Sequence, residues 1–233
     1  MRELTKMAAP ARRPRTEHSL QTSANAAVRW RAARCIVRHD DDDFRGVATA
    51  ALSLALAPAG VAQTSTAAPS KRMPDGKQWT TQNLNVDVAG SLCYDGSEQN
   101  CRQYGRLYTF DLAQQACRTL GAGWRLPTNE EWRRLAIPFG GIRQESADLG
   151  KAAYLALIAG GSSGFDAVFG GGRTNPSGEY ERIDAHGFYW SATETETDPV
   201  RVWIYNFGKN GQSVGRHENG EKLWALSVRC VKD

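Results

Sequence analysis

The fold class of this chain is decided by the stretch GWRLPTNEEW, residues 123–132. Thr128 is followed three positions later by Glu131, which is the spacing of a capping box. In that motif the threonine hydroxyl accepts a backbone N–H of the first helical turn, and the glutamate carboxylate accepts the N–H of the cap residue. Pro127 makes the residue before it extended, so a loop ends here and a helix begins. We interpret the two tryptophans as buried anchors of this junction, and not as a ligand platform or a catalytic loop.

Two further helices are predicted from start and stop residues of the same kind. Asp111 is followed by Gln114 at capping-box spacing, and the apolar residues that come next share one helical face. Gly121 is expected to end this helix. A third helix is predicted within SADLGKAAYLALIAGG, residues 146–161, with Ser146 as its cap.

Strand patterns lie before and after these helices. Residues 78–88 contain several β-branched residues and predict a first strand. Residues 200–207 and 222–231 alternate, and we expect a turn at Asn210-Gly211 to join them. Because the helices come first and most strands come later, the sequence predicts an α+β fold with two or three helices and a small twisted antiparallel sheet.

The N-terminal part is predicted to be processed and not folded. Residues 47–62 are uncharged and apolar, but they are fewer than the about 20 residues that a membrane-spanning helix needs. We interpret them as the hydrophobic region of a signal peptide; a disordered Ala-rich linker is the alternative. Residues 1–46 are then an extension, either disordered or upstream of the true translation start. A linker at residues 63–74 leads to a single domain at 75–233.

This interpretation predicts a secreted, periplasmic or cell-surface protein with no transmembrane span once the leader is removed. The cysteines agree with export. Of the five, Cys35 lies in the leader, and the remaining four are an even number that suits disulfides in an oxidising compartment. Four cysteines allow three connectivities, and the residues alone do not choose among them.

The charge distribution argues against a nucleic-acid partner. The formal net charge is +4, but residues 1–62 contain 10 basic and 6 acidic residues, whereas residues 63–233 contain 19 of each. The domain therefore has no excess of positive charge for a phosphate backbone.

Six pieces of the domain occur in an order that is similar to one known family. They are DGKQWTTQNLN, CYDGSEQNCRQYGRLYTF, GWRLPTNEEW, GFDAVFGGGR, GFYWSATE and SVRCVKD, and they run from Asp75 to Asp233. The set resembles the Fibrobacter succinogenes major paralogous domain family, in the C-type lectin-like and formylglycine-generating-enzyme-like group of folds. The resemblance implies one C-type lectin-like domain whose N- and C-terminal strands are adjacent. It also implies the disulfides Cys93–Cys101 and Cys117–Cys230.

We expect no catalysis from this domain. A formylglycine-generating enzyme needs reactive copper-binding cysteines, whereas cysteines held in disulfides have no thiolate. Only two histidines follow the leader, His186 and His217, and two isolated histidines do not make a zinc site.

One metal site is predicted in the segment TETETDP. Glu194, Glu196 and Asp198 alternate there, so in an extended loop their carboxylates would share one side and could converge on Ca²⁺. A solvated acidic loop is the alternative. No other cofactor is expected.

A ligand-binding surface is predicted on the loops and strand surface between Ser191 and Lys222. Both faces of the strand at 200–207 are largely apolar, which indicates a strand that is either central or partly exposed for binding. The alternative is that Tyr205 belongs to the core and that the other candidates are ordinary loop residues. The candidate contacts are Trp203, Tyr205, Asn206, Ser213, Arg216, His217 and Asn219.

These observations together predict an exported, non-catalytic domain that binds a protein or a glycan at the cell surface. The resemblance adds a narrower hypothesis, a variable protein of a diversity-generating retroelement, in which adenine mutation changes the binding residues. A structural or envelope-associated domain without a specific ligand is the alternative. An enzyme of the formylglycine-generating-enzyme-like fold comes third.

Overall fold

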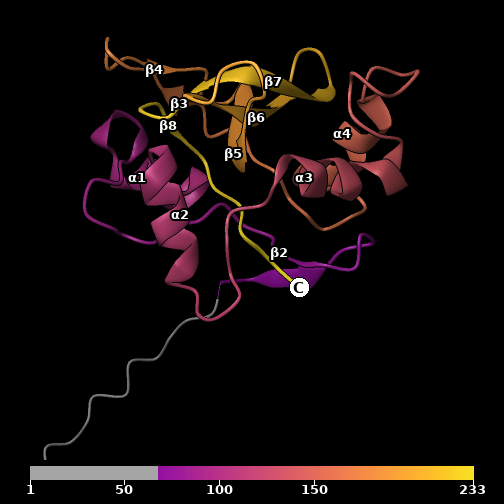
Figure 1. Ribbon diagram of the computed structural model, residues 1–233, viewed down its shortest axis with the longest axis horizontal. Coiled ribbons are helices and arrows are strands. Elements are labelled where there is room, and N and C mark those ends of the chain that lie inside the picture. The colour runs from indigo at the N-terminus through magenta and orange to yellow at the C-terminus, as the bar shows by residue number, and fades with distance from the viewer. Residues whose placement is uncertain (1–67) are drawn as a thin grey trace, which may run out of the picture. The chain divides into compact units, whose positions relative to one another are not determined.

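The computed structural model of the chain describes residues 68–233 (Figure 1). The predicted extension at 1–46, the predicted signal segment at 47–62 and residues 63–67 of the predicted linker lie outside the described residues. Within the described part, no helix has both the length and the apolar character needed to cross a bilayer.

The described residues form an α+β fold, as predicted, but with four α-helices instead of two or three. The helices are α1 (Glu98–Tyr104), α2 (Phe110–Arg118), α3 (Asn129–Ala136) and α4 (Lys151–Leu157), with two 3₁₀ turns, η1 (Tyr94–Gly96) and η2 (Ile137–Phe139). The strands are β1 (Ser70–Arg72), β2 (Gln78–Thr80), β3 (Gly172–Arg173), β4 (Tyr180–Glu181), β5 (His186–Glu194), β6 (Arg201–Gly208), β7 (Ser213–Glu221), β8 (Ala225–Leu226) and β9 (Val231–Lys232).

The strands form three antiparallel sheets of three strands each. Their orders are β1-β2-β9, β4-β3-β8 and β5-β6-β7. In the first sheet Trp79 pairs with Val231, so strands from the two ends of the domain are adjacent, as the resemblance implies. Figure 1 shows the C-terminus beside β2, with the β5-β6-β7 sheet and the short strands β3, β4 and β8 on the other side of the helices.

The predicted capping box at the start of α3 is confirmed. The Thr128 hydroxyl accepts the backbone N–H of Glu131 at 3.2 Å, and the Glu131 carboxylate accepts the backbone N–H of Thr128 at 2.8 Å. The capping box predicted at Asp111 is wrong, because α2 begins at Phe110 with Thr109 as its cap residue and without a side-chain cap. Phe110 is buried and its N–H donates to the carbonyl of Lys222 at 3.0 Å, so a tertiary contact sets this helix start.

The third predicted helix is shorter than expected. Ser146 is not its cap, because residues 146–150 form a turn in which the N–H of Gly150 donates to the Ser146 hydroxyl at 2.6 Å. Gly150 has φ of 79°, and a Cβ there would lie 2.6 Å from the carbonyl oxygen of Val214. The close approach of the turn to β7 therefore requires glycine, and α4 starts only at Lys151.

The strand predictions need two corrections. The predicted first strand at 78–88 is a strand only at 78–80, after which the chain leaves the sheet. The turn at Asn210-Gly211 joins β6 to β7 and not to residues 222–231, which contain the separate two-residue strands β8 and β9. Strand β7, SVGRHENGE, was missed because most of its residues are polar or glycine and it has no clear apolar alternation.

Residues 143–150 cover the outer edge of β7. The backbone N–H of Arg143 donates to the carbonyl of Val214 at 2.8 Å. The Gln144 side chain then takes the place of a strand: its amide N–H donates to the Arg216 carbonyl at 2.8 Å, and its oxygen accepts the Arg216 N–H at 3.3 Å. An edge strand that would otherwise offer free backbone groups is covered along this part.

The core is built around two tryptophans whose indole N–H groups bond to backbone. Trp132 donates to the carbonyl of Trp190 at 3.2 Å, and Trp190 donates to the carbonyl of Tyr108 at 2.7 Å. Trp132 also stacks on Tyr205, with ring centroids 5.1 Å apart. The predicted role of Trp132 as a buried anchor of the junction is thereby confirmed, since it is 2% exposed.

A fully buried arginine lies between the end of the domain and its beginning. Arg229 is 0% exposed, and within residues 68–233 no carboxylate lies within hydrogen-bonding distance of its guanidinium. Its Nε–H donates to the Asn83 side-chain oxygen at 2.8 Å. Its other donors bond to the carbonyls of Thr80 at 3.0 Å, Phe165 at 2.6 Å and Asp166 at 2.6 Å. Its planar face lies 4.5 Å from the centroid of the Phe165 ring.

Glu131 connects α3 with the paired terminal strands as well as capping its helix. Its carboxylate accepts two hydrogen bonds of 2.7 Å from Arg125 and lies 3.3 Å from the Lys77 ammonium. Burial alone would raise the pKa of Glu131. The hydrogen bonds from Arg125 and from the Thr128 N–H outweigh that effect and lower the pKa from 4.5 to about 2.

The first prediction concerns Glu131→Gln. Because the folded-state pKa lies below the unfolded value, the charged carboxylate stabilises the fold fully above pH 4.5, and this stabilisation is lost as the pH falls towards 2. We expect the substitution to lower the free energy of unfolding at pH 7 by about 2 to 3 kcal/mol, after allowance for the partly exposed Arg125. Urea unfolding measured from pH 7 to pH 2 should show a steeper loss for the unchanged protein than for the variant.

Glu130→Gln is the matched control, since Glu130 lies one position earlier and its ion pairs with Arg133 and Arg134 are exposed. Its effect should be small at every pH. Equal pH profiles for the two variants would show that the buried carboxylate has no special role.

Candidate functional site

The two faces of the β5-β6-β7 sheet have different surroundings. One face carries Tyr189, Tyr205 and Phe207, which are 0% exposed and lie in the core around Trp132. The strand register places Phe188 opposite Asn206, and Ile204 opposite His217, on the other face. These side chains line a cavity of about 280 Å³.

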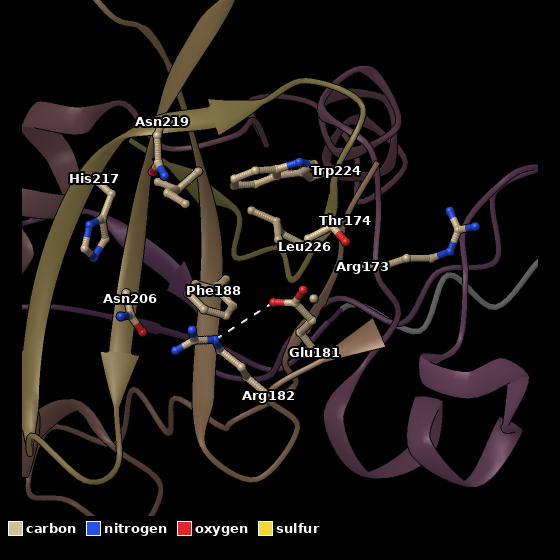
Figure 2. Close-up of a pocket in the computed structure, with 12 residues that line it drawn as sticks. Arg173, Thr174, Glu181, Arg182, Phe188, Asn206, His217, Asn219, Trp224 and Leu226 are labelled. Carbon is tan, nitrogen blue, oxygen red and sulfur yellow. Dashed lines mark ion pairs between the residues drawn. The ribbon is translucent and has the colours of Figure 1, made fainter. Parts of the chain in front are cut away.

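The remaining walls of the cavity come from the β3-β4 hairpin and from the segment that leads into β8. Figure 2 shows Trp224 and Phe188 on opposite sides of the cavity with Leu226 between them, and shows Asn206, His217 and Asn219 along one side. A Cβ at Gly172 would lie 2.8 Å from a methyl group of Leu226. A side chain at position 172 would therefore displace the Leu226 side chain, which forms part of the cavity floor.

The cavity has an apolar floor and a polar rim. Leu226 and Ile204 are each 3% exposed and form the floor, while Phe188 and Trp224 are half-buried. Asn206, His217 and Asn219 supply amide and imidazole groups at the rim. A mostly apolar hollow with a few converging polar groups is the usual form of a small-ligand site.

Phe188 and Asn206 are held in place by a third side chain, His186. The imidazole ring stacks on the Phe188 ring, with centroids 5.4 Å apart and an interplanar angle of 9°. Its Nδ1 lies 3.0 Å from the Asn206 side-chain oxygen. One aromatic wall and one polar group of the cavity are thus positioned before any ligand arrives.

A turn with unusual backbone geometry brings charged groups to the cavity. Arg182 has φ of 64°, and its carbonyl accepts the N–H of His186 at 2.9 Å. Its guanidinium lies 3.5 Å from Nε2 of His186, and 4.0 Å from the carboxylate of Glu181. Non-glycine residues rarely adopt this conformation unless the surrounding structure imposes it, and they occur often at functional sites.

The surroundings of His217 favour the uncharged form of its imidazole. Although much of the residue is exposed, desolvation lowers the pKa of His217 below 6.5, and the positive charge of Arg143 lowers it further. The ring therefore offers both a donor and an acceptor to a ligand.

Three of the seven predicted contact residues line this cavity, namely Asn206, His217 and Asn219. Trp203 and Arg216 lie outside it, with the Arg216 guanidinium 4.6 Å from the centroid of the Trp203 ring. Together with Gln144 they border a second hollow, of about 410 Å³, which shares His217 and Asn219 with the first. Ser213, at the start of β7, borders neither hollow.

Tyr205 requires a correction as a predicted ligand contact. It is 0% exposed, and its hydroxyl donates to the carbonyl of Asn129 at 2.8 Å. Its ring therefore has no surface to offer, and the alternative that placed it in the core is the one that the structure supports. Both faces of its strand are apolar, so the sequence did not indicate which face is covered by α3.

Sequence reasoning missed the residues of the cavity that lie outside the interval 191–222. Phe188 and Trp224 are separated by 36 positions, and the sequence does not show that the two rings border one cavity. Glu181 and Arg182 had no sequence signal, because strands of two residues produce no readable alternation.

The predicted calcium ligands do not converge. Among the described residues, one group of three potential metal ligands has its ligand atoms close enough to share an ion: Cys93, Glu98 and Cys101. Both of these cysteines are in a disulfide. Glu194 instead pairs with Lys222 at 2.5 Å, and Asp198 with Arg201 at 3.4 Å. The expectation that Glu194, Glu196 and Asp198 share one side is therefore corrected, because β5 extends through Glu194 and a turn follows.

Both disulfides implied by the resemblance are present in the structure. Cys93–Cys101 has a sequence separation of 8, and Cys117–Cys230 has a separation of 113. The second joins α2 to the end of the chain. In the chain-entropy model, closing a loop of that length contributes about 4 to 5 kcal/mol.

These features define a class of protein: a disulfide-bonded α+β domain with a cavity on one face of a small antiparallel sheet. The family model described as the Fibrobacter succinogenes major domain matches residues 65–232. The chain belongs to this family. Searches among the curated proteins and among the solved structures found no match.

The second prediction separates the buried face of β6 from the rim of the cavity. Tyr205→Ala removes a fully buried ring that stacks on Trp132, so we expect the free energy of unfolding to fall by about 3 to 5 kcal/mol. Asn219→Ala changes an exposed side chain and should alter it by no more than about 0.5 kcal/mol. Urea denaturation followed by far-UV circular dichroism measures both. A Tyr205→Ala protein as stable as the Asn219→Ala protein would contradict the assignment of faces.

Proposed function

We propose that this chain is an exported, non-catalytic ligand-binding domain with a C-type lectin-like fold, and that the cavity bounded by Phe188 and Trp224 is its binding site. The observation that carries the proposal is the pairing of an apolar floor with polar groups fixed in advance. Asn206 is oriented by His186, and the ring of Phe188 is held by the same imidazole. Groups held in place before binding lose little conformational freedom when a ligand arrives, which favours affinity.

The proposal of binding without chemistry is supported by the charges at the cavity. Among the described residues that line the cavity, two side chains could exchange a proton with a ligand, the Glu181 carboxylate and the His217 imidazole. Glu181 pairs with Arg182, and no hydrogen bond between described residues joins His217 to a carboxylate or hydroxyl that would orient it as a general base. Binding to a protein or glycan at the cell surface is the partner class that suits an exported domain of this kind.

The third prediction tests binding at this site. In nuclear magnetic resonance titrations with a panel of soluble oligosaccharides and a panel of peptides, a ligand should shift the Trp224 indole signal and the Asn206 and Asn219 side-chain signals in a saturable way. Phe188→Ala should weaken this binding while the protein stays folded, because Phe188 is only half-buried. The ligand should be recovered chemically unchanged.

Leu155→Ala is the matched control, since Leu155 is 50% exposed on α4 and lies outside the cavity. It should bind as the unchanged protein does. Chemical conversion of the ligand would favour the enzyme alternative. If neither panel shifts the Trp224, Asn206 and Asn219 signals, a structural or envelope-associated domain would be favoured.

The fourth prediction concerns export, which the two disulfides support because such bonds persist in oxidising compartments. Protein produced with its own leader should carry a new N-terminus close to Gln63, as measured by mass spectrometry of the purified product. An intact N-terminus on cytoplasmic protein with free thiols would contradict export.

The narrower retroelement hypothesis stays a proposal within this function. It is favoured by Asn206, His217 and Asn219, because adenine mutation of an Asn codon can produce each of these residues and all three line the cavity. The flanking DNA decides it: a second copy of the final codons, differing mainly at adenines and beside a reverse transcriptase, is the expected finding.

A further inference from the structure

We propose that the ligand of the cavity is the terminal ring of a neutral glycan, held between Trp224 and Phe188 and bonded through its hydroxyls to Asn206, His217 and Asn219. The inference rests on the proposed binding function of the same cavity and names its ligand class.

The two aromatic walls suit the apolar faces of a sugar ring. Trp224 and Phe188 stand on opposite sides of the cavity in Figure 2, with Leu226 between them. Ile204 also lines the cavity and is buried. A pyranose ring has C–H groups on its faces and hydroxyls at its edge, so it can pack against such walls while its edge faces the rim. The His186 ring stacks on Phe188 and so supports this wall in its observed orientation.

The polar rim suits hydroxyls better than it suits groups that only donate or only accept. The Asn206 oxygen is engaged by His186, which leaves its amide N–H groups as donors. Neutral His217 offers a donor and an acceptor, and the exposed amide of Asn219 offers both as well. Each hydroxyl of a sugar can both donate and accept a hydrogen bond. The hydroxyls along the edge of one sugar ring can therefore form hydrogen bonds with all three side chains.

The charges at the cavity argue for a neutral ligand. The Arg182 guanidinium is offset by Glu181 at 4.0 Å, and Arg173 lies over the Tyr180 ring, 5.7 Å from its centroid, and points away from the cavity (Figure 2). A phosphate or carboxylate ligand would approach the Glu181 carboxylate without gaining an unpaired cation. A single lining carboxylate also gives no set of oxygen ligands for Ca²⁺, so recognition would not depend on that ion.

The dimensions indicate one enclosed ring at the end of a longer chain. A cavity of about 280 Å³ lies at the lower limit for drug-sized ligands and suits one ring-sized unit. The neighbouring hollow of about 410 Å³ shares His217 and Asn219 with it and offers the Trp203 ring, which Arg216 covers on one side. A second sugar unit can therefore continue across β7 towards Trp203.

The experiment is isothermal titration calorimetry with the purified full-length protein. The neutral probes are the methyl glycosides of glucose, galactose, mannose and N-acetylglucosamine, with their disaccharides and trisaccharides. The charged probes are the matching uronic acids, and a set of tetrapeptides completes the panel. We expect one neutral series to bind, disaccharides to bind more tightly than monosaccharides, and affinity to be unchanged by a chelator.

Two tryptophan substitutions test the placement of the units. Trp224→Ala should weaken the binding of every member of the series by roughly tenfold or more, and Trp224→Phe should recover part of the loss. Trp203→Ala should weaken the disaccharide and trisaccharide but leave the monosaccharide unchanged. Thermal unfolding of each variant checks folding, and Asn219→Ala, at an exposed position, provides a second test of the rim that does not disturb packing.

The outcomes separate this inference from the function on which it rests. Binding of peptides or uronic acids at the Trp224 indole, without binding of neutral sugars, would overturn the glycan inference and leave the binding function standing. Calcium-dependent sugar binding, or equal losses for all chain lengths in Trp203→Ala, would also overturn it. Binding of no probe, with no shift of the cavity signals by any ligand, would overturn both.

Discussion

The buried guanidinium of Arg229 is the constraint on which the rest of the domain depends. Removing a charge from water is costly, and among the described residues carbonyl and amide oxygens bond to this guanidinium, while the Asp166 carboxylate acts on it only through its charge. Those oxygens belong to Thr80 at the end of β2, to Asn83 shortly after it and to the loop at 165–166, so the first and middle parts of the domain must be in place around the last. Lysine could not satisfy this arrangement, because its donors radiate from one atom whereas the guanidinium presents a planar set that also packs on Phe165.

The candidate site follows from this core through a short series of contacts. Arg229 lies 5.8 Å from the ring centroid of Tyr189, whose hydroxyl donates to the carbonyl of Val168 at 2.8 Å. These contacts fix β5 with Tyr189 inward, and alternation along the strand then points Phe188 outward. The N–H of Ser227 donates to the Phe188 carbonyl at 3.0 Å, which brings the segment carrying Trp224 and Leu226 beside it. The cavity is thus built by elements that the core already holds.

The sequence predicted those structural features that depend on residues close together in the chain. The capping box of Thr128 and Glu131 is complete within four residues, and its motif was sufficient to find α3. The start of α2 was misplaced because Phe110 bonds to Lys222, more than a hundred positions away. Strand β7 and the hairpin of β3 and β4 were missed for a related reason: their pairing depends on partners and not on their own apolar pattern. The site combines residues from 172 to 226 on six strands and the segments between them, so its candidates were found only where they lay close together in the chain.

The Gln144 clamp on the edge of β7 has a consequence for how this surface can change. Its amide bonds to the backbone of Arg216 and not to its side chain. The protection of the edge is therefore independent of which amino acid occupies position 216 or the exposed positions beside it. A strand that faces a cavity on one side can then accumulate substitutions without becoming a template for intermolecular β-pairing, which is the usual hazard of altering an edge. Mutational tolerance and resistance to aggregation often oppose each other. In β7 the side chains can change, whereas the backbone of Arg216 keeps the hydrogen bonds that protect the edge.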